Sequence, residues 1–101
     1  MSPLEISLAK IRALSSLERK TLLHRGLKLS EEVGELSEAL LAIEDAPGMA
    51  YKGLNLNNVK EEAIDVILIT LSICYMVNMS DEEIAELLMK KCGKWEEKQS
   101  K

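Results

Sequence analysis

Aromatic residues and histidine are scarce in this chain of 101 residues. Phenylalanine is absent, aromatic residues make up 3% of the chain, and His24 is its single histidine. Di-iron centres in helical bundles pair glutamates with histidines in E-x-x-H motifs, so a lone histidine outside such a motif argues against that type of site. Leucine, isoleucine, alanine, glutamate and lysine dominate instead, which is typical of a helical protein.

Proline, glycine and cysteine are also few. The chain has two prolines and five glycines, and it is 47% hydrophobic and 30% charged. This composition excludes a disordered tail, and the length suits one domain, residues 1–101, with one core. The two cysteines, Cys74 and Cys92, suggest buried or incidental thiols in a reducing compartment rather than a disulfide framework.

Long hydrophobic runs and basic stripes are missing as well. The longest apolar run, residues 66–77, falls short of the roughly 20 residues that a membrane span needs, and the N-terminus lacks the apolar core of a signal peptide. The formal net charge is −4, the pI is about 5.0, and the basic residues are scattered. We therefore expect a cytoplasmic protein that binds neither membranes nor nucleic acid.

Capping motifs mark the starts of the expected helices. Ser2, followed by Pro3 and Glu5, forms a capping box for the first helix, which we expect to end near Ser15. The spacing of Ser15 and Glu18 repeats the motif, and apolar residues then recur at helical spacing from about residue 17 to residue 45. Residues 46–57 have the composition of a loop.

Two further helices are expected after that loop. Asn58 with Glu61 predicts the start of a third helix that runs to about Val77, and Ser80 with Glu83 predicts the start of the last. No alternating pattern competes, so the sequence predicts an all-α fold, an antiparallel bundle of about four helices. The third helix is apolar nearly all round, which places it in the middle of the bundle. Because three neighbours would not cover it, we expect a homo-oligomer, a homodimer or homotetramer.

Four glutamates lie close together on the second helix, at positions 31, 32, 35 and 38. At about 100° per residue, Glu32 borders the apolar stripe, Glu35 lies beside it, and Glu31 and Glu38 fall deeper into the solvent face. The stripe consists of Leu29, Val33, Leu36, Leu40 and Ile43. Glu38 therefore has the position of a surface residue, whereas Glu32 does not.

The third helix carries Glu62 and Asp65 on one face of its first turns. A buried unpaired carboxylate costs several kcal/mol, so these acids need partners. A salt bridge to Lys28 or Lys60 is the structural alternative for any single acid. However, E-x-x-E on one helix and E-x-x-D on the next supply four carboxylates that an antiparallel pair aims at one point. All-oxygen ligation suits a hard divalent ion, Mg²⁺ or Mn²⁺.

The paired motif resembles the signature of the MazG-like all-α nucleoside triphosphate pyrophosphohydrolases, E-E-x-x-E followed by E-x-x-D. It reads here as Glu31-Glu32-Val-Gly-Glu35 and Glu62-Ala-Ile-Asp65, and the likeness spans roughly residues 28–98. The resemblance implies Mg²⁺-dependent cleavage of the α–β phosphate bond of (deoxy)nucleoside triphosphates, giving the monophosphate and pyrophosphate, in nucleotide-pool house-cleaning. It also implies clefts near the subunit contacts of an oligomer.

Residue roles follow from the same resemblance. Glu32, Glu35, Glu62 and Asp65 map onto the metal ligands, and Glu31 onto an extra ligand or a base that orients the water. Lys94 and Lys98, in K-W-x-x-K, are similar to a segment that contacts phosphate, although an asparagine that often precedes it is replaced by Cys92-Gly93. Tyr51, Tyr75 and Trp95 are the aromatics available for stacking on a base. The alternative function is a non-catalytic helical interaction or regulatory module.

Overall fold

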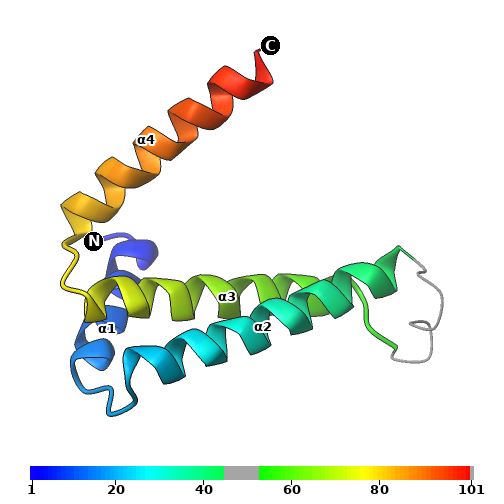
Figure 1. Cartoon of the computed structure of the whole chain (residues 1–101), viewed down its shortest axis with the longest axis horizontal. Coiled ribbons are helices and arrows are strands. Elements are labelled where there is room, and N and C mark those ends of the chain that lie inside the picture. The colour runs from blue at the N-terminus through cyan, green and yellow to red at the C-terminus, as the bar shows by residue number, and fades with distance from the viewer. Residues whose placement is uncertain (45–52, 101) are drawn as a thin grey trace.

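The computed structural model of the chain describes residues 1–44 and 53–100, and these residues form four helices without a strand (Figure 1). The helices are α1 (Pro3–Ser16), α2 (Leu22–Ile43), α3 (Leu56–Met76) and α4 (Asp81–Gln99). The predicted all-α architecture of about four helices is confirmed. Most of the predicted loop at residues 46–57, including Tyr51, lies outside the described residues.

The predicted starts of α1 and α4 are confirmed by their caps. The hydroxyl of Ser2 accepts a hydrogen bond from the Glu5 amide, and the Glu5 carboxylate accepts one from the Ser2 amide, which completes the capping box. At the start of α4, Ser80 accepts from the amide of Glu83 over 3.1 Å. Both caps satisfy amides that have no partner inside their helix.

The start predicted for α2 at Ser15 is wrong. Thr21 is the N-cap, and it accepts from the amide of His24, so the helix begins at Leu22. Ser15 does not cap because its hydroxyl is buried, donates to the carbonyl of Ile11 over 2.6 Å, and lies 2.7 Å from the hydroxyl of Ser72 in α3. The side chain of Ser15 therefore makes a tertiary contact instead of the helix cap that the local motif predicts.

The cap predicted for α3 is one turn too late. Asn55 is the N-cap, and its side chain accepts from the amides of Asn57 and Asn58. Asn58 returns the interaction, since its side-chain oxygen accepts from the Asn55 amide over 2.9 Å. In this capping box Asn55 is therefore the N-cap, and Asn58 is the third residue of the helix. The predicted end of α3 is confirmed, with Val77 as its C-cap.

The helices α2 and α3 run antiparallel along most of their length, and α1 packs across α3 near its C-terminal end (Figure 1). The buried side chains of the described residues lie on these three helices. They are Ser15, Glu32, Ala39, Ala42, Ile69, Ser72 and Tyr75. Because α4 extends away from the α2–α3 pair and buries no side chain, the four helices do not lie side by side in one bundle.

We expected α3 to lie in the middle of the fold, and other helices cover it on two of its sides. It contacts α1 and α2, but Ile64 and Ile67 on another side are 61% and 52% exposed. Within residues 1–44 and 53–100, each helix is too short or too polar to span a lipid bilayer.

Candidate metal centre

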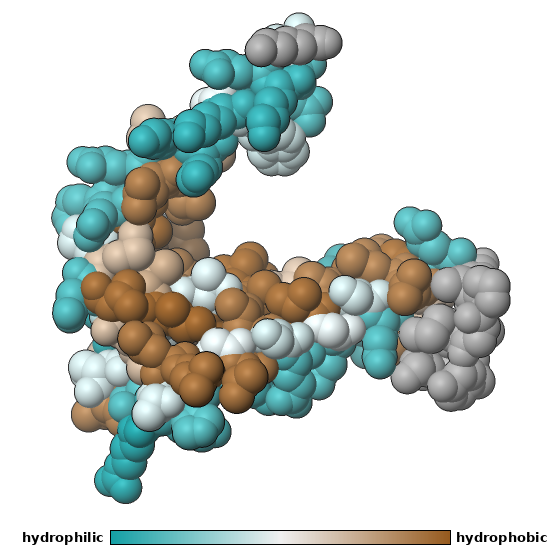
Figure 2. Space-filling view, viewed as in Figure 1, coloured by the Kyte–Doolittle hydropathy of each residue, from teal (hydrophilic) through white to brown (hydrophobic). Residues whose placement is uncertain are grey.

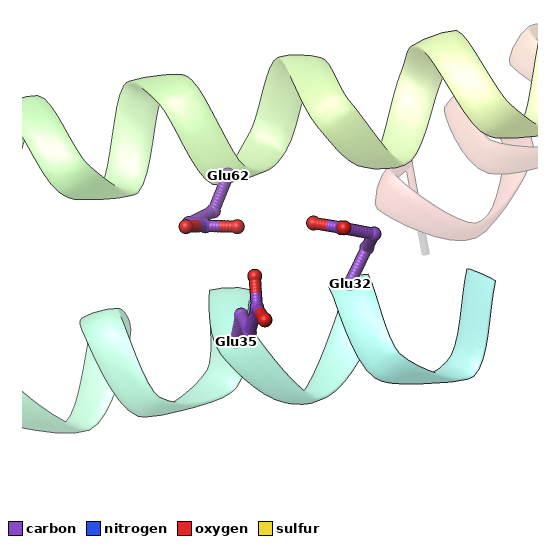
Figure 3. A group of neighbouring side chains, drawn as sticks. All are labelled: Glu32, Glu35 and Glu62. Carbon is purple, nitrogen blue, oxygen red and sulfur yellow. The ribbon is translucent and has the colours of Figure 1, made fainter. Parts of the chain in front are cut away.

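Three of the predicted acidic ligands converge between α2 and α3. Glu32 and Glu35 extend from α2, and Glu62 extends from α3 toward them (Figure 3). Each of the three offers a carboxylate oxygen, and these oxygens all lie within 4.8 Å of one another. The i, i+3 spacing puts the first two on one face of α2, and the antiparallel pairing brings the third to the same point. We call these three residues the acid cluster.

The acid cluster is set into the contact between the two helices. Glu32 is 7% exposed and Glu62 is half-buried, whereas Glu35 is exposed. Among the described residues, the Oε2 atoms of Glu32 and Glu62 are both buried without a hydrogen-bond partner. Buried polar atoms normally have a partner, so these two oxygens make the acid cluster a candidate site for a cation.

The electrostatics of the acid cluster are unfavourable without a cation. Burial, a hydrogen bond with Glu35, and the charges of Glu35, Glu32 and Asp65 together raise the pKa of Glu62 from 4.5 to about 7. Like charges that share a site disfavour the ionised form of each other. Near neutral pH the cluster thus holds more negative charge than its surroundings stabilise.

Lys28 is the cation that the structure places beside the cluster. Its Nζ lies 3.2 Å from Glu32 Oε1 and 3.5 Å from Glu31 Oε1. The hydrogen bond to Glu32 is the main reason that the pKa of Lys28 is raised. The side chain of Lys28 is 42% exposed, so the pair is screened by solvent and contributes little. Because Lys28 pairs with Glu31 and Glu32, its positive charge does not balance the negative charges of Glu35 and Glu62.

A hard divalent cation fits this donor set. The convergent atoms are all carboxylate oxygens, and a cation among them would supply the partner that the two buried oxygens lack. Mg²⁺ and Mn²⁺ prefer oxygen ligands, and Mg²⁺ usually keeps several waters while it binds one or two carboxylates and the phosphates of a substrate. The expected Mg²⁺ site therefore has suitable ligands at the expected place.

The other predicted acids lie around the cluster and do not complete it. Asp65 is half-buried and acts on Glu62 through its charge, but its carboxylate is not among the convergent oxygens. It lines a shallow hollow with Lys60, Glu61 and Ile64. Glu31 is exposed on the far side of Lys28, and Glu38 lies exposed further along α2. The structure thus brings together three of the four predicted ligands.

The basic residues predicted to contact phosphate lie elsewhere. Lys94 and Lys98 are exposed near the end of α4, which leads away from α2 and α3 (Figure 1). The structure does not bring them to the acid cluster of their own chain, and their contact with phosphate stays a prediction.

The helical spacing predicts Glu32 at the border of the core, but in the structure Glu32 lies in the contact between α2 and α3. The buried residues of α2 are Glu32, Ala39 and Ala42, while Val33 and Leu40 of the predicted stripe are each 44% exposed. The small side chains of the two alanines allow close approach of α3. The sequence does place Glu32 and Ala39 two turns apart, and this spacing indicates that both lie on one face of the helix.

Comparisons with known proteins give no match: no family model fits the chain, and neither the curated proteins nor the solved structures include one similar to it.

Proposed function

We propose that this protein is a Mg²⁺-dependent nucleotide pyrophosphohydrolase, which cleaves the α–β phosphate bond of a (deoxy)nucleoside triphosphate. The observation that carries the proposal is the acid cluster, with its two buried and unpartnered carboxylate oxygens. An acidic protein would be able to hold a polyphosphate through a metal ion, because its carboxylates would hold the ion and the ion would supply positive charge to the phosphate oxygens.

Glu32, Glu35 and Glu62 would hold the cation, and Asp65 adds negative charge one turn along α3. A Mg²⁺ ion bound there would neutralise charge on the phosphate oxygens and would lower the pKa of a bound water. Mn²⁺ has the same ligand preference.

The residues of the chain have separate roles around this cation. Glu31 is exposed and contacts the cluster through Lys28, and its carboxylate would orient the attacking water and accept a proton from it. Lys28 lies between Glu31 and the cluster, so its ammonium provides positive charge for a phosphate oxygen. Water adds across the anhydride, and the products are a nucleoside monophosphate and pyrophosphate.

The test is product analysis with purified protein and Mg²⁺ on a panel of common and damaged NTPs and dNTPs. We expect pyrophosphate and the monophosphate from at least one substrate, and no turnover in EDTA. Orthophosphate and a diphosphate as products would show that the bond is wrongly assigned. Inactivity on every substrate would favour the alternative function, a non-catalytic helical interaction module, which the exposed apolar side chains of α3 and α4 support.

A further inference from the structure

A separate hollow lies where α1 and the start of α2 meet α3, and we call it the three-helix hollow. Its volume is about 140 Å³. A protein cavity of about 150 Å³ is large enough to receive one benzene ring. The three-helix hollow therefore has room for a single six-membered ring.

Most of the wall of this hollow is aliphatic. Ile11 and Leu14 of α1 and Leu68 of α3 line it, together with the buried serines Ser15 and Ser72. The hydroxyl of Ser15 donates to the carbonyl of Ile11, so the Ser72 hydroxyl, 2.7 Å away, donates to Ser15. Because both protons are used inside the wall, the serines leave the wall without a free donor. A flat apolar ring suits such a wall.

Two charged side chains, Arg25 and Glu18, form the polar part of the hollow. The Arg25 side chain is 16% exposed, and its Nε is buried without a hydrogen-bond partner in the described part of the chain. Its NH1 lies 3.7 Å from Glu18 Oε2, which is longer than a hydrogen bond. The amide of Lys20 donates to Glu18 and lowers the pKa of its carboxyl, and the charge of Arg25 acts in the same direction. The hollow thus offers a donor beside an ionised acceptor, and the two charges cancel.

The three-helix hollow lies along the same helix contact as the acid cluster. Arg25 and Glu32 are seven residues apart, which is two turns on one face of α2 and roughly 10 Å along its axis. Leu68 follows Glu62 by six residues on α3, so the antiparallel pair puts the hollow on one side of the cluster (Figure 1). Lys28 lies between Arg25 and Glu32 on α2. A nucleoside monophosphate spans a similar length from the edge of its base to its phosphate.

We propose that the three-helix hollow binds the base of the nucleotide substrate and that this base is a pyrimidine. The inference rests on the proposed function, in which the acid cluster holds the phosphates through a metal ion. The volume of the hollow suits one six-membered ring better than the fused rings of a purine.

The charges of the hollow favour a base over an anion. A carboxylate next to the guanidinium would repel a phosphate, whereas a neutral ring with both donors and acceptors on its edge would satisfy both side chains. Arg25 would donate to a ring carbonyl or ring nitrogen, and Glu18 would accept from a ring or amino N–H. These two residues would then determine which bases the protein binds.

Binding of nucleosides in EDTA tests the base site separately from catalysis. We expect cytidine or uridine to bind the parent protein at least about tenfold more tightly than adenosine and inosine, measured by NMR titration at millimolar concentration. Equal or tighter binding of the purine nucleosides, or no binding of any of the four, would overturn the proposal.

The same experiment distinguishes a wrong base site from a wrong activity. Pyrimidine nucleosides that bind to a protein releasing pyrophosphate from no nucleotide would support the base site and reject the pyrophosphohydrolase. Pyrophosphate release from purine nucleotides alone would support the activity and overturn the base site.

Arg25→Gln and Arg19→Gln form a matched pair of variants. Arg19 is exposed between α1 and α2 and does not line the hollow. We expect Arg25→Gln to weaken the binding of the pyrimidine nucleosides by about tenfold or more, and Arg19→Gln to leave it unchanged. If Arg25 only ties α2 to Glu18, the ratio of pyrimidine to purine binding stays at the parent value, and that result would contradict the proposal.

If Arg25→Gln does not fold, Arg25→Lys replaces it. Lysine keeps the positive charge beside Glu18 but lacks the planar fork of donors, so we expect a similar loss of pyrimidine binding. Full retention of the pyrimidine preference in Arg25→Lys would show that the guanidinium does not contact the base.

Discussion

Two groups of polar side chains in this protein differ in how well their members satisfy one another. In the α1–α3–α4 junction, opposite charges meet: Asp81 accepts from Tyr75 and pairs with Arg12, and the hydroxyls of Ser15 and Ser72 share a hydrogen bond. In the acid cluster, three carboxylates meet between α2 and α3, and two buried oxygens lack a partner.

The difference is the one expected between a structural group and a ligand site. A group whose donors and acceptors match needs nothing further, so it fixes the path of the chain. A group of like charges is costly in the fold, and a ligand of opposite charge would stabilise it. The two groups should therefore respond differently to substitution and to metal.

The largest expected effect is on turnover. Glu62→Gln and Glu35→Gln each remove one charge from the acid cluster, and we expect each to lower pyrophosphate release by roughly 10²-fold or more. Glu38→Gln is the control, since Glu38 is an exposed glutamate one turn after Glu35 and outside the cluster. If Glu35→Gln and Glu38→Gln have comparable activity, the acid cluster contributes no more to turnover than an exposed glutamate outside it.

The next effect is on stabilisation by metal. At a Mg²⁺ concentration of about 100 times its Kd, the free energy of unfolding of the parent should rise by about 2.7 kcal/mol. Glu62→Gln should lose most of this rise and should equal or exceed the parent in EDTA, because one of the mutually repelling charges is gone. Thermal unfolding with and without EDTA measures both quantities.

A structural role for Glu62 predicts the reverse. Removing one partner of a buried ion pair costs about 3–5 kcal/mol whether or not metal is present. If Glu62→Gln loses that much stability equally in EDTA and in Mg²⁺, the acid cluster belongs with the junction and is no ligand site.

The junction should respond without regard to metal. Asp81→Ala removes the acceptor of the buried Tyr75 hydroxyl, so we expect a loss of about 1–3 kcal/mol that is the same in EDTA and in Mg²⁺. Chemical denaturation in both conditions checks this. A loss that appears only in Mg²⁺ would connect Asp81 to the metal site and contradict the comparison.

The smallest expected effect is a pH dependence of the metal-free protein. The pKa of Glu62 is raised in the folded state to about 7, from 4.5. The folded protein therefore holds a proton that the unfolded chain releases, and this contribution to stability is complete below pH 4.5 and is lost as the pH rises through about 7. In EDTA, the Tm of the parent should fall between pH 5 and pH 8 more than the Tm of Glu62→Gln. Parallel curves for the two proteins would show that Glu62 titrates normally.

The sequence by itself determined the class of the fold and which acidic side chains were candidates for a shared site. Helical periodicity, together with the caps at Ser2 and Ser80, predicted four helices because these are local interactions between residues three or four apart. The acidic motifs on two successive helices predicted a convergence, because an antiparallel pair has few ways to bury carboxylates. The structure brings three of them, Glu32, Glu35 and Glu62, to one point.

Only the tertiary structure decided the rest, since it depends on contacts between residues distant in the chain. Ser15 has the spacing of a helix cap but bonds with Ser72 across α1 and α3, so α2 begins at Leu22. The direction of α4 depends on Arg12, Tyr75 and Asp81 together, and no local motif describes a contact among three helices. That direction leaves apolar side chains of α3 and α4 exposed (Figure 2), so the tertiary structure also decided which apolar residues are not buried.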